Sequence, residues 1–354
     1  MKYKTDDLRI SGKQEVIPPE ELHREYPVTD VASTTVRSTR QSIHEILHKE
    51  SRRFLVIVGP CSIHDPKAAR EYAARLKPLI DELSDDLCIV MRIYFEKPRT
   101  TVGWKGLIND PHLDDSFNIN HGLRQARSLL LDIADLGVPA GTEFLDLISP
   151  QYISDLVSWG AIGARTTESQ GHRELASGLS CPVGFKNGTD GGLKVAVDAI
   201  QAASKPHVFM SLTKQGHSAI FSTTGNEDCH IILRGGKAPN YDAASVRQAI
   251  AQLESNHQNP SIMVDCSHAN SQKDYSRQLE VCRNVAAQVK GGNQNIMGVM
   301  LESHLVEGRQ NIADVDDTSD LVYGQSVTDA CINWENTEIL LRELAKAVHV
   351  RNGG

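Results

Sequence analysis

The stretch FLVIVGPCSIHDPKAAREYAARLKPLIDELSDDLCIVMR, residues 54–92, contains one complete unit of the fold. It begins with a short β-branched run, continues with an amphipathic segment at 67–83, and ends with a second apolar run that starts at residue 87. Short β-branched runs favour buried strands, and apolar residues at helical spacing favour a helix packed on one face. This order therefore predicts a βαβ unit with parallel strands.

The same alternation continues along the whole chain of 354 residues. We expect strands at 54–59, 87–93, 138–143, 160–164, 182–186, 229–235, 261–266 and 296–302. Amphipathic segments predict helices at 67–83, 121–136, 192–203, 243–254, 274–289 and 335–350. Eight strand–helix units favour an α/β fold with a closed (β/α)8 TIM barrel, and an open doubly wound sheet is the alternative.

Three segments exceed a minimal barrel, which takes about 250 residues. Residues 1–50 form an N-terminal extension with an expected helix at about 35–49, and residues 206–228 form an inserted β-hairpin with strands at 207–212 and 218–223. A polar loop at 306–325 follows the eighth strand. We expect residues 51–354 to form the catalytic barrel and the extension to serve regulation or oligomerisation.

The bulk composition, with 40% hydrophobic and 23% charged residues, is that of an ordinary globular protein. A net charge of −8 argues against nucleic acid or an anionic membrane as a partner. We find neither a secretory signal at the amino terminus nor an apolar run of the roughly 18 residues that span a bilayer. Seven scattered cysteines without a CxxC pair fit reduced thiols, so we expect a cytoplasmic protein.

Ionisable side chains recur where the predicted strands end, which is where barrel enzymes build their active sites. These positions carry Cys61, Arg92, Glu143, Arg165, Lys186, Arg234, His268 and Glu302, with Asp329 before the last helix. One such residue alone would be a solvated loop charge, but agreement at eight strand ends favours a site.

These residues fall into two chemical sets. Cys61, His268, Glu302 and Asp329 offer a thiolate, an imidazole and two carboxylates, which suit a divalent Mn, Fe, Co or Zn ion better than calcium or magnesium. The second set is cationic and comprises Arg92, Lys97, Arg99, Lys105, Arg165, Lys186 and Arg234. Converging cations repel one another unless they bind an anion, so the set predicts a substrate with carboxylate and phosphate groups, although Lys105 fits a solvated loop.

A second motif, HEILH at residues 44–48, has the HExxH pattern of zinc metallopeptidases. Its neighbours Ile43 and Leu47 indicate the buried face of a helix, and the sequence indicates no third ligand on a neighbouring element. We therefore expect no catalytic zinc there. The turn NGTDGG at 187–192 fits an anion nest or a plain strand-to-helix turn.

Several long segments carry a family resemblance: GPCSIHDP (59–66), MRIYFEKPRTTVGWKGLINDP (91–111), GAIGARTTESQ (160–170), PVGFKNGTDG (182–191), ILRGGKAPNY (232–241) and DCSHANS (265–271). From about residue 6 to its end the chain resembles the amino-acid-regulated class of 3-deoxy-arabino-heptulosonate 7-phosphate (DAHP) synthases. The resemblance implies a barrel transferase that uses a divalent metal to condense phosphoenolpyruvate with erythrose 4-phosphate. This reaction is the first step of the shikimate pathway to the aromatic amino acids.

The resemblance also implies roles for single residues. The metal ligands fall on Cys61, His268, Glu302 and Asp329. The phosphoenolpyruvate pocket falls on Arg92, Lys97, Glu143, Gly163, Ala164, Arg165, Lys186 and Arg234. Arg99 and Thr100 would bind the phosphate of erythrose 4-phosphate. Lys97 is the candidate acid that protonates the new hydroxyl, with bound water as the alternative.

Feedback inhibition by an aromatic amino acid is a further implication, at a pocket shared between subunits of a homodimer or homotetramer. Its matching positions are Asp6, Asp7, Ile10, Pro150, Gln151, Leu175, Leu179, Ser180, Phe209, Ser211 and Phe221. The resemblance favours phenylalanine over tyrosine, because phenylalanine-sensitive members also carry serine at position 211, where tyrosine-sensitive ones tend to carry glycine. The physical reading is that the Ser211 side chain takes space that a phenol hydroxyl would need. Phe221 departs from the smaller aliphatic residue of many relatives, which reshapes the pocket.

Two other functions share parts of this pattern. A related phosphoenolpyruvate-condensing enzyme that uses arabinose 5-phosphate would have the same barrel and cations, but the KPRTT segment favours erythrose 4-phosphate. A non-catalytic amino-acid sensor on a barrel would not need the intact metal and cation sets.

Overall fold

The computed structural model describes residues 3–99, 103–315 and 317–354. Its central sheet is a closed barrel with all strands parallel, in the neighbour order β1-β10-β9-β8-β5-β4-β3-β2. The strands are β1 (Phe54–Gly59), β2 (Leu87–Arg92), β3 (Ala140–Glu143), β4 (Trp159–Ile162), β5 (Val183–Lys186), β8 (Cys229–Leu233), β9 (Ile262–Asp265) and β10 (Ile296–Glu302). The predicted TIM barrel is confirmed, and the open sheet is excluded.

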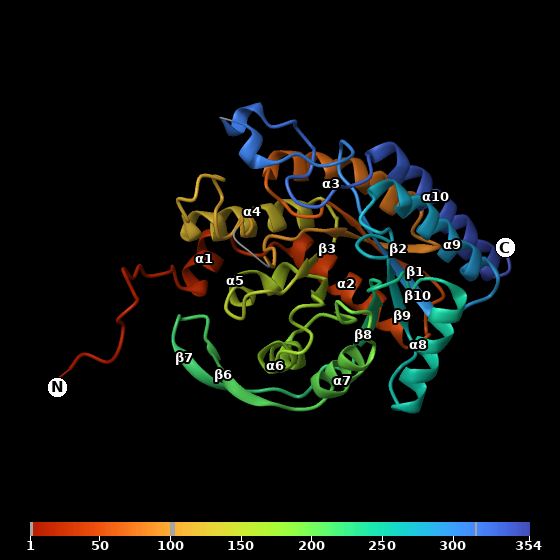
Figure 1. Cartoon of the computed structure of the whole chain (residues 1–354), viewed down its shortest axis with the longest axis horizontal. Coiled ribbons are helices and arrows are strands. Elements are labelled where there is room, and N and C mark those ends of the chain that lie inside the picture. Colours follow the sequence, from red (N-terminus) through yellow and green to blue (C-terminus); the bar gives the residue numbers. More distant parts are fainter. Residues whose placement is uncertain (1–2, 100–102, 316) are drawn as a thin grey trace.

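Helices surround the barrel (Figure 1). They are α3 (Pro66–Glu82), α4 (Ile119–Asp135), α6 (Gln170–Gly178), α7 (Lys194–Ala203), α8 (Ala243–Ser255), α9 (Gln278–Lys290) and α10 (Trp334–Arg351). Helix α6 was not among the segments predicted from amphipathicity. The connection from β3 to β4 contains only the single turn α5 (Pro150–Ile153) and a 3-10 turn at Ser154–Leu156.

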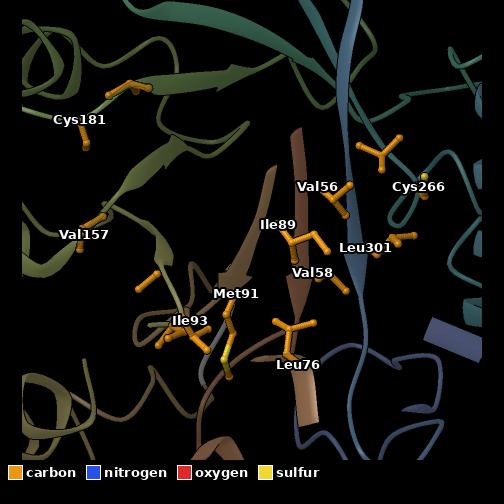
Figure 2. Close-up of a cluster of buried hydrophobic side chains, with 14 of the residues drawn as sticks. Val56, Val58, Leu76, Ile89, Met91, Ile93, Val157, Cys181, Cys266 and Leu301 are labelled. Atoms are coloured by element: carbon orange, nitrogen blue, oxygen red, sulfur yellow. The ribbon is translucent and has the colours of Figure 1, made fainter. Parts of the chain in front are cut away.

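Alternation along the strands divides the core into two layers. Phe54, Val56 and Val58 of β1 belong to the larger cluster between the barrel and its helices, whereas Leu55 and Ile57 belong to a second cluster inside the barrel. Figure 2 shows side chains of the outer layer, with Val56 and Val58 near Ile89 of the neighbouring strand. This two-sided burial explains why the strands are largely apolar along their length.

The N-terminal extension contains two helices, α1 (Pro19–Glu25) and α2 (Asp30–Leu47). The prediction that its helix starts near residue 35 was wrong. Thr29 caps α2 by accepting a hydrogen bond from the amide of Ala32 at 3.0 Å. The first turns are rich in serine, threonine and valine, which have low helix propensity, and the Thr34 hydroxyl bonds back to the Asp30 carbonyl at 2.7 Å.

Helix α2 closes the amino-terminal end of the barrel. Its buried residues Ile43, Ile46 and Leu47 belong to the same apolar cluster as Leu55 and Trp159 in the barrel interior. The opposite end, where the strands terminate, is therefore the end available for a substrate.

The inserted hairpin pairs β6 (Val208–Leu212) with β7 (Ser218–Ser222) as a separate two-stranded sheet, as predicted (Figure 1). Phe209 and Phe221 stack with ring centroids 6.2 Å apart on its half-buried face. Its other face exposes three large apolar side chains, Val208, Met210 and Ile220.

The polar loop after β10 folds back against the chain. It contains 3-10 turns at Ile312–Asp314 and Thr318–Asp320, and Gly308 and Arg309 form isolated bridges with Cys331 and Ser326. Among the described residues, no helix has the length and apolarity that crossing a membrane requires.

Candidate active site

Three of the four predicted metal ligands converge at the carboxyl ends of the strands. Possible ligand atoms of Cys61, Glu302 and Asp329 all lie within 4.8 Å of one another. The Cys61 Sγ lies 3.7 Å from the Asp329 Oδ2. His268 approaches the same cluster, with its Nε2 3.8 Å from the Glu302 Oε1. All four residues are thus brought to one place from β1, β9, β10 and the segment before α10.

Two buried cations brace this cluster. The Lys97 Nζ lies 3.1 Å from the Cys61 Sγ, and the Arg92 guanidinium pairs with the Glu302 carboxylate at 2.9 Å. Arg92 also donates to the carbonyls of Pro60 and Cys61 and lies 3.5 Å from the centre of the Tyr94 ring. These hydrogen bonds hold Arg92 against the loop that carries Cys61.

Electrostatics in the cluster favour a further cation. Burial and the neighbouring Glu302 charge raise the pKa of the Cys61 thiol to about 11, against the opposing effect of Lys97. Burial alone would raise the pKa of Asp329, but Lys97 and His268 bring it below its ordinary value. Deprotonation of the Cys61 thiol would place a thiolate beside two carboxylates, and three anions in this small volume would repel one another. The donor set therefore fits a divalent metal ion, whose charge stabilises the thiolate.

Asp265 holds two of the predicted residues in place. Its Oδ2 accepts from the Lys186 Nζ at 2.8 Å and lies 2.9 Å from the His268 Nδ1. The carboxyl group is fully buried, which would raise its pKa, yet the charge of Lys186 holds the pKa well below the usual range. Because the His268 Nδ1 is held by Asp265, its Nε2 is directed toward Glu302, as in carboxylate–histidine–metal arrangements.

Backbone conformation assists the same orientation. His268 has a φ of 55°, in the left-handed region that residues other than glycine seldom adopt. The neighbouring Ser267 hydroxyl donates to Asp265 at 2.6 Å. The chain thus turns sharply directly after β9, and this turn brings the imidazole back over the barrel.

Glu143 lies at the end of β3 against Gly163. A side chain at position 163 would collide with the Glu143 carboxylate, so this glycine leaves the space that the carboxylate occupies. Gly163 itself lies one residue beyond β4 rather than inside it. The two residues, both predicted from the resemblance, are therefore neighbours across two strand ends.

The cavity at this end has a volume of about 370 Å³, within the size range of small-molecule sites. It is lined by Arg234, Ser267, His268, Ser271, Lys273, Tyr275, Gln278, Glu302, Arg309, Asp329 and Ala330. Ala164 and Arg165 line another hollow, together with Glu168 and Arg173. Burial lowers the pKa of Arg234, and the charge of Arg165 lowers it further. The two arginines therefore lie close enough to repel each other.

The remaining predicted residues lie on the segment after β2. Arg99 is exposed and donates to the Trp104 carbonyl at 2.7 Å. Lys105 is exposed, and its carbonyl accepts from the Lys97 amide. Thr100 lies outside the described residues. Lys97 and Arg99 thus face different surroundings although two positions separate them.

Sequence reasoning missed three charged residues of the site, Asp265, Lys273 and Arg309, together with uncharged residues that line the cavity, among them Ser267 and Tyr275. Asp265 ends a buried strand, the same signal that identified Glu143 and Glu302, so it was recognisable. Lys273 and Arg309 lie in loops, and only the closure of the barrel and the folding back of the 306–325 loop bring them to the cavity.

The interpretation of the HExxH motif needs a correction. A third possible ligand does accompany it, because Asp228 lies directly before β8 with its Oδ1 2.8 Å from the His44 Nδ1 and 2.9 Å from the His48 Nε2. This contact joins residues that are 180 or more positions apart. Sequence spacing therefore gave no sign of it.

Several of the residues predicted for an effector pocket gather around the hairpin. The Lys214 Nζ donates to the Gln151 carbonyl, and the Ser177 hydroxyl lies 2.7 Å from that of Thr223. These contacts place the third loop, helix α6 and the hairpin side by side. Asp6, Asp7 and Ile10 are exposed in the extended amino-terminal segment, which runs away from the barrel (Figure 1).

Fold and site together define a barrel enzyme with a divalent-metal centre beside a pocket for anionic substrates. Residues 28–342 match the model of the DAHP synthetase I family. The chain belongs to this family, as the resemblance predicted.

Individual relatives are similar over almost the full length. The chain is 61% identical to the Phe-sensitive phospho-2-dehydro-3-deoxyheptonate aldolase of Escherichia coli K12, over 100% of both chains, and 54% identical to the Tyr-sensitive enzyme of the same strain, over 96% and 95%. A solved phospho-2-dehydro-3-deoxyheptonate aldolase from Francisella tularensis SCHU S4 superposes with a TM-score of 0.94 at 52% identity, over 97% of this chain and 100% of that one.

The role of Asp265 leads to a first prediction. Asp265→Asn keeps the size of the side chain but removes the charge that holds Lys186 and His268. We expect metal affinity to fall about 10–100-fold, the usual effect of losing a carboxylate behind a ligating histidine. Equilibrium dialysis against a metal buffer measures it, with Asp85→Asn on the exposed surface as the control. Unchanged metal affinity in Asp265→Asn would show that His268 is not held for metal binding.

Proposed function

We propose that this chain is a DAHP synthase that condenses phosphoenolpyruvate with erythrose 4-phosphate and water, and releases phosphate. The observation that carries the proposal is the cluster of Cys61, Glu302 and Asp329 beside His268, next to converging cations at one end of the barrel. The names of the similar enzymes support the same reaction class.

The proposed metal ligands are Cys61, His268, Glu302 and Asp329, for a Mn, Fe, Co or Zn ion. When bound, such an ion supplies Lewis acidity toward the aldehyde oxygen of erythrose 4-phosphate. Arg92 and the Ser62–Thr328 hydrogen bond of 2.7 Å tie the loops that carry Cys61 and Asp329 to each other and to the barrel. These contacts preorganise the ligands before any substrate enters.

The proposed role of the cations around the cavity is to hold and align the two anionic substrates. Arg165, Lys186 and Arg234 bind the carboxylate and phosphate of phosphoenolpyruvate, together with Arg92, Lys97, Glu143, Gly163 and Ala164. Lys273 and Arg309 add charge at the same cavity. Arg99 and Thr100 bind the phosphate of erythrose 4-phosphate. Alignment of this kind offsets the repulsion between the two anions. It also moves the loss of translational entropy from the reaction step to the binding step.

Lys97 is the proposed proton donor to the hydroxyl that forms from the aldehyde. Burial opposes its charge, but the neighbouring Cys61 and Glu302 raise its pKa above the ordinary value, so Nζ holds a proton beside the ligand cluster. The protonated Nζ lies 3.1 Å from the Cys61 Sγ.

We also propose that the extension, residues 1–50, and the hairpin, residues 206–228, form the regulatory and assembly part of a homo-oligomer. The exposed apolar face of the hairpin, with Met210 85% and Ile220 77% exposed, suits a subunit interface. An aromatic amino acid would bind between this part and the third loop, at the predicted pocket residues. Seven unpaired, buried cysteines support placing the chain in the cytoplasm.

A contact from the proposed effector pocket reaches the active site. The Ser149 hydroxyl donates to the Glu96 carboxylate at 2.8 Å, and Ser149 lies directly before Pro150 and Gln151. Glu96 is buried, which raises its pKa to about 7, and it precedes Lys97 in the chain. This contact offers a physical link by which an effector at the third loop alters the segment that carries Lys97.

Chelation should abolish activity, and added manganese, iron or cobalt should restore it. Cys61→Ala should lose the active-site metal and turnover while the fold survives, because a side chain at a strand end supports little of the core. Phosphate release measures turnover, and circular dichroism measures folding. Cys181→Ala, a buried cysteine distant in sequence from the cluster, is the control. Full activity of Cys61→Ala in excess chelator would remove the metal from the mechanism.

Loss of one cation that contacts phosphoenolpyruvate should weaken its binding. Arg165→Ala and Lys186→Ala should each cost about 1.5–3 kcal/mol, on the order of tenfold to a hundredfold in affinity. Lys105→Ala should have little effect, because Lys105 is exposed and contributes a backbone contact. Isothermal titration of phosphoenolpyruvate compares the three variants. Wild-type affinity in both Arg165→Ala and Lys186→Ala would place the substrate elsewhere.

Phenylalanine should inhibit the enzyme more strongly than tyrosine does. A steric clash between the Ser211 side chain and the phenol hydroxyl costs about 1–3 kcal/mol, and Ser211→Gly should relieve it and increase sensitivity to tyrosine. Titration of each amino acid into the phosphate-release assay measures the effect. Stronger inhibition of the wild type by tyrosine would reverse the assignment, and no inhibition by either would leave the extension without an effector role.

A further inference from the structure

Three side chains with metal-ligating atoms meet at the amino-terminal end of the barrel, away from the active site. The Nδ1 of His44 and the Nε2 of His48 lie 2.8 and 2.9 Å from the Oδ1 of Asp228, and the imidazole centroids are 4.2 Å apart. We propose that His44, His48 and Asp228 form a second divalent-metal site, of the zinc type, which ties the extension to the barrel.

The backbone places these residues independently of any ion. His44 and His48 are one helical turn apart, so both point from the same side of the end of α2. That helix is anchored by Ile43 and Leu47 in the barrel interior. Asp228 is fixed from the other side, because its amide donates to the Asn226 side chain at 3.0 Å. An ion would therefore need little ordering of the chain on binding.

The donor set has the chemistry of zinc. Two imidazoles and one carboxylate form a common zinc ligand set that leaves the fourth position to water. Bonds of about 2.0–2.1 Å in a tetrahedron separate ligand atoms by about 3.3 Å, so the observed spacing needs to open by only a few tenths of an ångström. The side chains of His44, His48 and Asp228 are 30%, 31% and 20% exposed, which gives an ion and its water access.

Electrostatics at this position also favour a cation. The carboxylates of Asp228, Glu227 and Glu50 surround His44 and make this position electronegative. The last turn of α2 adds the partial negative charge of the helix terminus. Arg40 lines the adjacent hollow, but its guanidinium donates to backbone carbonyls of the loop before β4. The charge of Arg40 is therefore directed at these carbonyls and not at the three ligand atoms.

A peptidase role does not accompany the site. In metallopeptidases the glutamate of HExxH is the general base. Here Glu45 accepts from Gln41 at 3.2 Å and pairs with Arg53 at 3.7 Å. Because these contacts engage the Glu45 carboxylate, it is not free to act as a general base. The ion would therefore have a structural role and would join the extension to the barrel.

Zinc binding can be tested with the active-site metal removed. In the variant Cys61→Ala/His268→Ala, which lacks two proposed ligands at the active site, we expect one zinc ion per chain by equilibrium dialysis and atomic emission. Zinc should also raise the Tm of this variant. Adding His48→Gln should lower the affinity of the remaining site for zinc by at least ~10-fold. Loss of a direct ligand should cost at least as much affinity as loss of a residue that positions a ligand. His48→Gln retains a donor for Asp228, so the Tm without zinc should be nearly unchanged.

The matched control is His349→Ala, which removes an exposed histidine 3.6 Å from the Asp86 carboxylate. It should leave zinc content unchanged. Cobalt in the Cys61→Ala/His268→Ala variant should show ligand-field bands of an imidazole and carboxylate site without a thiolate-to-cobalt band. The proposal is overturned if this variant binds no zinc, or if adding the His48→Gln substitution leaves its zinc affinity unchanged.

Discussion

Crowding of acidic groups at one end of the barrel is the constraint on which the active site depends. Closure of eight parallel strands brings Cys61 and Glu302 from neighbouring strands β1 and β10 to within ligand distance, and Asp329 returns to the same point before α10. Three acidic groups in so small a volume are unfavourable without compensation, because like charges in a poorly solvated site repel strongly. Lys97, Arg92 and a divalent ion supply that compensation.

The two ends of the barrel have different roles: the amino-terminal end contributes to stability, and the carboxyl end carries the charged groups of the site. At the amino-terminal end, α2 covers the interior with apolar side chains, including Ile43 and Leu47, and contributes to the folded state by excluding water. At the carboxyl end, buried ionic contacts such as Lys186 with Asp265 cost desolvation and are held by the surrounding barrel. Burial at one end therefore offsets the cost of preorganised charges at the other.

The sequence predicted the barrel well because each strand is buried on both faces and is largely apolar. It also singled out ionisable residues at strand ends that the structure brings together, since an ionisable residue at the end of such a strand is unusual. It failed at a contact between residues far apart in the sequence and at the start of one helix. The partnership of Asp228 with His44 crosses more than 180 positions, and the start of α2 depends on a Thr29 cap that outweighs poor helix propensity. Asp265 was missed although its position followed the rule applied to Glu302.

The loop at 306–325 shows how an addition to a barrel becomes part of its site. Its polar sequence indicates a loop after the eighth strand without a defined role, and the bridges of Gly308 with Cys331 and of Arg309 with Ser326 turn it back along the segment that carries Asp329. Arg309 reaches the cavity as a result. One loop therefore both contacts the segment that carries Asp329, a proposed metal ligand, and brings a cation to the cavity. Both features depend on the same set of backbone contacts.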